Sequence, residues 1–176
     1  MKGRYMCKRP NDPYNTVEEQ TRLEKLYGYS AIDDYELSGT FKHVASLAAR
    51  IFDVPLAFVN FVDKENVLIK ASIGADGVES ISREIGLCSL AIQQEKVTVI
   101  KNAKLDPLFF SNPIVHGDFG MQFYAGAPIR TPDGFNIGVV AVADRKPRHF
   151  TAEQEELLEE LASLVMDELE EWQSKK

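Results

Sequence analysis

Apolar residues recur with helical spacing in two segments near the start of the chain. The first segment begins after Thr16, which can cap a helix together with Glu19, and it ends at Gly28. In the second segment apolar residues follow one another every three or four positions, at Leu37, Phe41, Val44, Ala48 and Ile51. Both patterns predict amphipathic helices, and the apolar stripe of the second must be covered by the rest of the protein.

Shorter apolar runs predict the strands. Residues 56–63 and 66–74 are rich in β-branched and aromatic side chains and are separated by a charged turn, which predicts an antiparallel pair. Residues 96–100 predict a further short strand. Residues 123–144 predict a β-hairpin, because the turn Pro132-Asp133-Gly134 supplies a proline that presets φ and a glycine that accepts a positive φ.

The middle of the chain predicts a helix and a long loop. Cys88 and Ala91 share one face of an expected helix over residues 88–94, which Ser89 is available to cap. The stretch 101–120 is longer than an ordinary connection and is rich in aromatic residues. Loops of this length inside a compact domain are often functional.

The last helix completes the pattern. Thr151 and Gln154 form a capping box, and glutamates fill the first turn, where the helix dipole favours them. The apolar stripe of this helix consists of Leu157, Leu161, Leu164, Val165, Leu169 and Trp172. The order of the elements lacks a regular βαβ alternation and predicts an α+β fold, in which helices cover both faces of a mostly antiparallel sheet.

Length and composition indicate the class of protein. A chain of 176 residues suffices for a single core, and we expect residues 16–176 to form one domain and residues 1–15 a flexible arm. The hydrophobic share of 44% is that of a globular protein, and no apolar run approaches the ~20 residues of a membrane helix. With no secretory signal either, we expect a stand-alone cytoplasmic protein.

Charge and cysteine content exclude further classes. The net charge of −7 argues against nucleic acid and against an anionic membrane surface as partners, because both require clustered Lys and Arg. Cys7 and Cys88 lie far apart, which predicts reduced thiols. His43, His116 and His149 lack the spacing of metal ligands, so we expect no metal site, and the residues assign no cofactor.

Cys88 is the residue at which chemistry is most plausible. The sequence contains no phosphate-binding loop, nucleophile elbow or zinc-peptidase motif. Near a helix start the thiol of Cys88 would experience the N-terminal dipole, which lowers the pKa of a thiol. The alternative is a buried small hydrophobic residue, which the sequence favours because no basic partner lies nearby.

Several motifs together closely resemble the bacterial GAF domain. They occur in the order of that family, and the resemblance runs from Thr16 to Trp172. The motifs are "PLAFVNFVD" (55–63), "CSLAI" (88–92), "VIKNAKLDPLF" (99–109), "NPIV" (112–115), "FYAGAPI" (123–129), "PDGFNIGVVAVAD" (132–144) and "PRHFTAEQ" (147–154).

The resemblance implies a GAF/PAS-like, profilin-type fold with about six antiparallel strands. It also implies a sensory module that is dimeric through its first and last helices, with a pocket between the sheet and the mid-chain helix and loop for an unknown small molecule or a signalling partner. In this sequence the residues expected to border that pocket are Cys88, Ser89, Phe109, Phe110, Asn112, Phe123 and Tyr124. Phe123 and Tyr124 are adjacent in one strand, so only one of them can face a given side of the sheet.

Two alternatives accompany this hypothesis. The segment "GLCS" at 86–89 resembles the cysteine motif of free methionine-R-sulfoxide reductase, a GAF enzyme, which would make Cys88 catalytic, but the loop 101–120 holds no resolving cysteine. The other alternative is a ligand-free structural or dimerisation module. The motif of cyclic-nucleotide-binding GAF domains is absent, and the cysteine and histidine arrangement of bilin-binding domains is not found.

Overall fold

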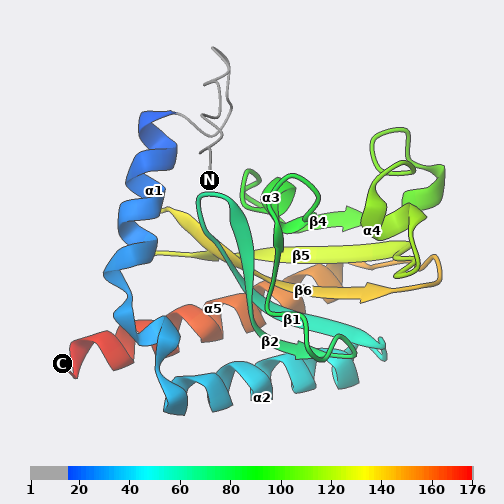
Figure 1. Ribbon diagram of the computed structural model, residues 1–176. Helices are drawn as coiled ribbons and strands as arrows, with labels where there is room; N and C mark the ends of the chain where they lie inside the picture. Colours follow the sequence, from blue (N-terminus) through cyan, green and yellow to red (C-terminus); the bar gives the residue numbers. More distant parts are fainter. Residues whose placement is uncertain (1–15, 176) are drawn as a thin grey trace.

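The sheet at the centre of the molecule is antiparallel throughout (Figure 1). The computed structural model describes residues 16–175, so the expected arm at 1–15 lies outside the described residues. The six strands are ordered β3-β2-β1-β6-β5-β4, which confirms the predicted α+β fold. Their bounds are β1 Leu56–Val62, β2 Asn66–Ile73, β3 Ser80–Ser82, β4 Thr98–Ile100, β5 Phe123–Arg130 and β6 Asn136–Asp144.

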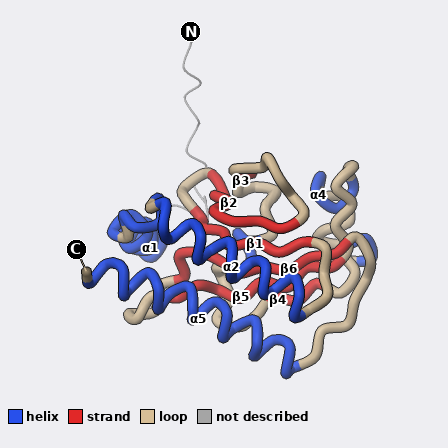
Figure 2. The backbone as a smooth tube through the Cα atoms, turned by 90° about the horizontal axis from the view of Figure 1, so that it is seen from below, coloured by secondary structure: helices blue, strands red, loops and turns tan. Residues whose placement is uncertain are grey.

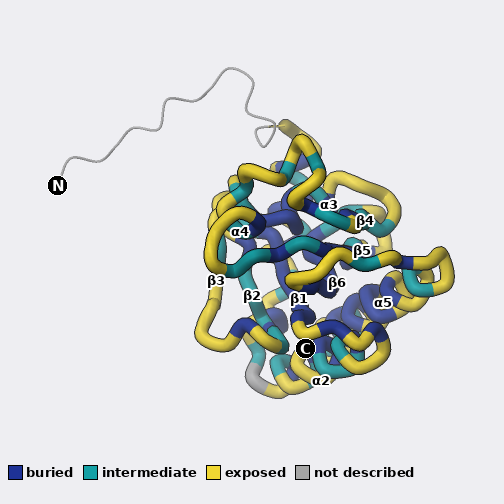
Figure 3. Tube along the Cα trace, turned by 90° about the vertical axis from the view of Figure 1, so that its right-hand side faces the viewer, coloured by how far each residue is buried: buried dark blue, intermediate teal, exposed yellow. Residues whose placement is uncertain are grey.

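Helices cover both faces of this sheet. The bounds are α1 Val17–Gly28, α2 Tyr35–Ile51, α3 Cys88–Ala91, α4 Pro113–His116 and α5 Ala152–Ser174, with short 3-10 turns η1 Ser30–Asp33 and η2 Ala103–Leu105. Figure 2, seen from below, shows α2 and α5 side by side in front of the sheet, while α3 and α4 lie on the opposite side of the sheet (Figure 1). Buried segments concentrate in the sheet and along the inner sides of α2 and α5 (Figure 3).

Helix α1 has a different orientation from α2 and α5 (Figure 1). It stands across one end of the sheet (Figure 1). Its Leu23 and Leu26 join the apolar core shared with α2 and α5. Thr16 caps the helix by accepting a hydrogen bond from the Glu19 backbone N–H at 3.1 Å. The Glu19 carboxylate, expected to complete the capping box, instead binds Arg22 and Arg83.

The longer helices follow their predicted stripes with local corrections. In α2 the predicted stripe is buried except for its last member, Ile51, which is 48% exposed at the helix end. In α5 the capping box of Thr151 and Gln154 is confirmed. Leu157 and Leu164 were expected to face the core but are 41% and 40% exposed. The face of α5 that packs on the core lies to one side of these two residues. Its buried side chains are Leu158, Leu161, Ala162, Val165, Met166 and Leu169.

Short elements in the middle of the chain differ most from the prediction. The helix expected over 88–94 is the single turn α3, Cys88–Ala91, and Ser89 does not cap it. Strand β3 was not predicted; it extends the sheet by pairing with β2. The stretch 101–120, expected as a loop, contains η2 and α4. The hairpin turn is confirmed, with Gly134 at φ 95°.

Candidate functional site

A cluster of three polar side chains lies between the sheet and α3. Side chains alternate along β1 and β5, so Asn60 and Tyr124 both point to the α3 side of the sheet. There they contact Cys88, the first residue of α3: the Tyr124 hydroxyl donates to the Cys88 Sγ at 3.2 Å, and the Asn60 Nδ2 donates to the same atom at 3.3 Å. We call Asn60, Cys88 and Tyr124 the polar trio.

The polar trio is buried in an apolar layer. All three side chains are almost fully shielded from solvent. The buried hydrophobic side chains of this layer include Phe58, Val62, Leu87, Ile92, Ile100, Val115, Met121, Val139 and Ala141. The Asn60 Oδ1 is buried as well and accepts no hydrogen bond from any residue that the structure describes. An acceptor left in this state costs free energy, so it marks a place where a donor would be stabilised.

The chemistry of Cys88 differs from that of an activated thiol. Burial raises the pKa of the Cys88 thiol, and the hydrogen bonds from Tyr124 and Asn60, which favour the thiolate, do not outweigh it. The expectation of a pKa lowered by a helix dipole is therefore wrong, while the interpretation of Cys88 as a buried residue is confirmed. Burial likewise raises the pKa of Tyr124, so its hydroxyl remains a donor.

A reductase reaction would need a second thiol to resolve a sulfenic acid. Among residues 16–175 the structure contains Cys88 as a free, buried cysteine, and the other cysteine of the sequence, Cys7, lies outside that range. Within the part of the chain that the structure describes, Cys88 therefore has no second thiol as a partner.

Ser89 and Asn112 form hydrogen bonds that hold together the chain segments next to the polar trio. The Ser89 hydroxyl donates to the Arg83 backbone oxygen at 2.7 Å. The Asn112 side chain accepts from the Ile114 N–H, which caps α4, and donates to the Ile85 backbone oxygen at 3.0 Å. Both residues thus join the segments that cover the sheet.

We call residues 101–120 the roof; they pack on the apolar layer that contains the polar trio. The Ala103 N–H donates to the Gln122 oxygen at 2.6 Å, and the Arg145 Nε donates to the Phe119 oxygen at 3.0 Å, so both ends of the roof are fixed to the sheet side. Phe109 is half-buried against the apolar layer, whereas Phe110 is 55% exposed. The roof therefore presents one aromatic ring inward and one to solvent.

Phe123 does not belong to this site. It points to the opposite face of the sheet, where its ring lies 5.6 Å from that of Phe150, because neighbouring residues of a strand alternate in direction. The prediction that Phe123 borders the pocket is therefore corrected, and Tyr124 is the member of the pair that faces the site.

Asn60 and a buried ion cluster are not among the residues predicted from the sequence. Asn60 was visible as a polar residue inside the apolar run "LAFVNFV", a signal that becomes specific only when its face is known. The ion cluster consists of Glu19, Arg22 and Arg83, which are all buried. Glu19 was assigned to helix capping, and nothing in the local sequence pairs it with Arg83, 64 residues further on.

Two further observations concern metals and membranes. Within residues 16–175, no group of three or more histidine, cysteine, aspartate or glutamate side chains has an arrangement that could hold a metal ion. In the same range no helix has both the length and the apolar character that crossing a membrane requires.

Comparisons with known proteins place this geometry in context. The family model of the GAF domain matches residues 36–169. A cyclic di-GMP phosphodiesterase of Pseudomonas aeruginosa is 38% identical over 127 residues, which cover 72% of this chain and 22% of that relative. The chain thus spans less than a quarter of the length of that relative.

Solved structures share the fold at low identity. The GAF domain of a phosphoenolpyruvate-protein phosphotransferase from Coxiella burnetii is 18% identical, with a TM-score of 0.66 over 92% of this chain and 98% of that one. The free methionine-R-sulfoxide reductase of Neisseria meningitidis, solved in complex with its substrate, is 18% identical, with a TM-score of 0.63 over 92% of this chain and 93% of that one. The family model, the antiparallel sheet and these likenesses agree, and the chain belongs to the GAF domain family, whose members are sensory and signalling modules.

Proposed function

We propose that this GAF domain senses a small, largely apolar molecule that carries one hydrogen-bond donor. The observation that carries the proposal is the buried Asn60 Oδ1, which lacks a donor among the described residues although it lies beside Cys88 and Tyr124. A ligand N–H or O–H at this oxygen would satisfy it. The hydrophobic side chains around the polar trio suit an apolar ligand body.

Entry to this site requires the roof to move. Cys88, Val115 and Tyr124 belong to one packed cluster, so a ligand would have to separate the roof from the sheet. Leu105 and Leu108 are exposed on the roof together with Phe110, and they offer apolar surface that could close over a ligand. A signal would then consist of a shift in the roof and α3 relative to the sheet.

The unit that we propose runs over residues 16–176. Helix α1 precedes the residues matched by the family model, yet Glu19 and Arg22 tie it to the domain. The helices would pass the signal to a protein partner. We propose that this partner is a signalling protein. The similarity to a segment of the Pseudomonas aeruginosa relative, which is named a cyclic di-GMP phosphodiesterase, supports this proposal.

Native mass spectrometry of freshly purified protein tests ligand binding. We expect a non-covalent mass on the wild-type chain that is lost in Asn60→Leu, because the substitution removes the acceptor and retains the approximate volume. Phe123→Leu is the matched control: it also changes a buried side chain of the sheet, but on the opposite face, and should retain the mass. A wild-type chain that carries no added mass, or one whose mass survives Asn60→Leu, contradicts the proposal.

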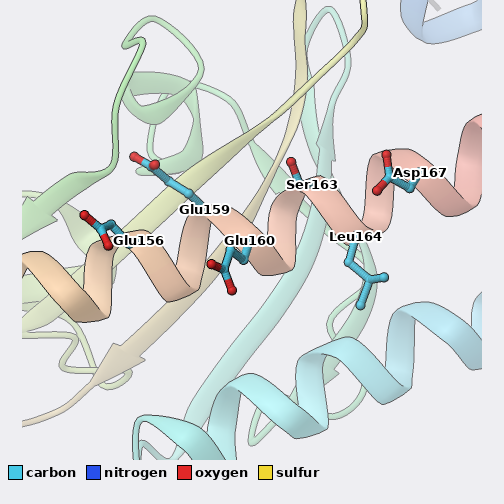
Figure 4. Close-up of a pocket in the computed structure, with 6 residues that line it drawn as sticks. All are labelled: Glu156, Glu159, Glu160, Ser163, Leu164 and Asp167. Carbon is cyan, nitrogen blue, oxygen red and sulfur yellow. The ribbon is translucent and has the colours of Figure 1, made fainter.

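We further propose dimerisation through the terminal helices. Leu157 and Leu164 are exposed along α5 and supply an apolar contact. An open hollow of about 510 Å³ lies on the same helix, lined by Glu156, Glu159, Glu160, Ser163, Leu164 and Asp167. In Figure 4, Glu156, Glu159 and Asp167 extend from one side of the helix and Leu164 from the other. Glu160 lies four residues before Leu164 and so shares its face of the helix, and two copies of α5 that meet through Leu157 and Leu164 would bring their Glu160 carboxylates close together.

Light scattering at increasing ionic strength tests this dimer. Salt screens the repulsion between the carboxylates of two α5 helices, so the dimer fraction should rise between 0.05 M and 0.5 M salt, roughly the range in which the screening length falls below ~10 Å. Leu164→Ser should lower the dimer fraction at every salt concentration. A monomer at micromolar concentration in high salt would contradict this proposal.

A further inference from the structure

Helix α1 is attached to the domain largely by charged side chains. Its buried residues are Glu19, Arg22, Leu23 and Leu26, so half of them are ionised. The Glu19 carboxylate lies between two guanidinium groups: Arg22 donates to it at 2.8 Å and 2.9 Å, and Arg83 donates to it from the other side. Burial raises the pKa of Glu19, but the hydrogen bonds from the two arginines outweigh it, so the pKa lies below its ordinary value.

Both arginines also bind the ends of strands. The Arg22 Nη1 donates to the Val62 oxygen at 2.8 Å, where β1 ends, and to the Asn136 oxygen at 3.3 Å, where β6 begins. The Arg83 Nη1 donates to the Asp63 oxygen at 3.2 Å, in the turn after β1. The remaining contacts of α1 along these turns, such as Lys25 with Asp133, are exposed, and exposed ion pairs contribute little.

Arg83 begins a segment that ends at the candidate site. Its backbone oxygen accepts from the Ser89 hydroxyl, and the Ile85 oxygen accepts from the Asn112 side chain in the roof. Cys88, a member of the polar trio, follows five residues after Arg83. Residues 83–89, which we call the connecting segment, therefore bind α1 at one end and the site at the other.

The opposite end of α1 reaches α5. The Gln173 side chain donates to the Gly28 backbone oxygen at 2.9 Å, and the Tyr29 hydroxyl, directly after α1, binds the Glu170 carboxylate. Because α1 stands across the end of the sheet, it joins the α3 side of the sheet to the α5 side (Figure 1). A change in its docking would reach α5.

We propose that the Glu19–Arg83 ion pair is a latch that holds α1 on the domain and opens when the connecting segment moves. This inference rests on the proposed function, because Arg83 would be displaced when the roof and α3 move to admit the ligand. Loss of Arg83 leaves Glu19 buried with one partner instead of two. The contacts that then retain α1 are weaker: the hydrogen bonds from Arg22 to the ends of β1 and β6 and the apolar side chains Leu23 and Leu26. The docked and undocked positions of α1 are the two states of the switch.

Amide hydrogen exchange read by mass spectrometry tests the latch without a ligand. In Arg83→Met, amides of residues 17–28 should exchange at least tenfold faster, with those of α2 and α5 changed by less than twofold. Arg83→Lys keeps the charge but not the guanidinium geometry and should lie between. Arg148→Met is the control, because Arg148 also binds a carboxylate, that of Asp144, and its other partners are the backbone oxygens of Phe52 and Asp53, after the end of α2. Unchanged exchange in α1, or equal acceleration in all helices, would overturn the latch.

A double substitution tests whether the site controls the latch. Ser89→Ala removes only the hydroxyl that binds the Arg83 oxygen, and it should accelerate exchange in residues 17–28 about threefold in the wild-type background. In the Arg83→Met background the same change should have no further effect, because the latch is already open. Equal effects in both backgrounds would refute the coupling. These outcomes do not depend on a bound ligand, so they remain separate from the mass measurement on the wild-type chain.

Discussion

Replacement of Glu19 by alanine is expected to lower the free energy of unfolding by about 3–5 kcal/mol. The carboxylate is buried between Arg22 and Arg83, which are themselves buried, so its removal takes the same buried counter-charge away from both guanidinium groups. Burial of unpaired charge is costlier than the loss of an exposed contact. Urea denaturation followed by circular dichroism measures the change.

Lys25→Ala is the matched control for Glu19→Ala, because it breaks an ion pair of the same helix. Lys25 binds Asp133 at 2.6 Å, but both side chains are about half exposed, 41% and 49%. The expected loss is much smaller than for Glu19→Ala, because exposed ion pairs contribute little to stability. Equal losses in the two variants would show that the buried position of Glu19 does not matter and would contradict the account of the ion cluster.

The pH dependence of stability gives a second measurement on Glu19. Its pKa in the folded protein lies below the ordinary value of 4.5, so the folded state releases this proton more readily than the unfolded state does. The stabilisation is complete above pH 4.5 and is lost as the pH falls through the lower pKa of the folded protein. The difference in stability between wild type and Glu19→Ala should therefore shrink in that acidic range.

Local patterns predicted the long elements of this fold because each carries its own signal. The Thr151 and Gln154 cap, the Gly134 turn and the apolar stripe of α2 all depend on residues within a few positions of one another. Strand β3 and the single turn α3 carry too few residues for a period to be read, and pairing with β2 and packing on the sheet determine them.

The candidate site was predicted only in part because its geometry is long-range. Cys88 and Tyr124 were named from motifs, but Asn60 comes from a different strand and becomes a partner only through the pairing of β1, β6 and β5. The direction of Phe123 illustrates the same limit. A strand pattern shows that neighbours alternate, and only the packing of β5 between two layers decides which of them faces α3.

Gly138 connects stability to the site, since β6 and β1 approach each other closely there. A Cβ atom at Gly138 would lie 2.3 Å from the Asn60 backbone oxygen and 2.9 Å from the Phe61 ring. Neither neighbour is the free end of a flexible chain, because both belong to the central strand β1. Gly138→Ala must therefore push β1 away from β6 at Asn60, the residue whose side chain binds Cys88.

We expect Gly138→Ala to lower the free energy of unfolding by about 3 kcal/mol, the upper part of the range for an overpacked core. It should also accelerate modification of Cys88 by a thiol reagent, measured with Cys7→Ser as the background. Gly39→Ala, in α2, is the control: its Cβ would meet nothing within 4 Å, and alanine in a helix is favoured over glycine by roughly 0.5–1 kcal/mol. The two changes add the same methyl group. We expect them to change the free energy of unfolding in opposite directions, because backbone atoms fill the space at Gly138 whereas the space at Gly39 is open.

A Gly138→Ala variant with unchanged stability would mean that β1 moves at Asn60 without cost. A strand that moves so readily could not position Asn60 against Cys88.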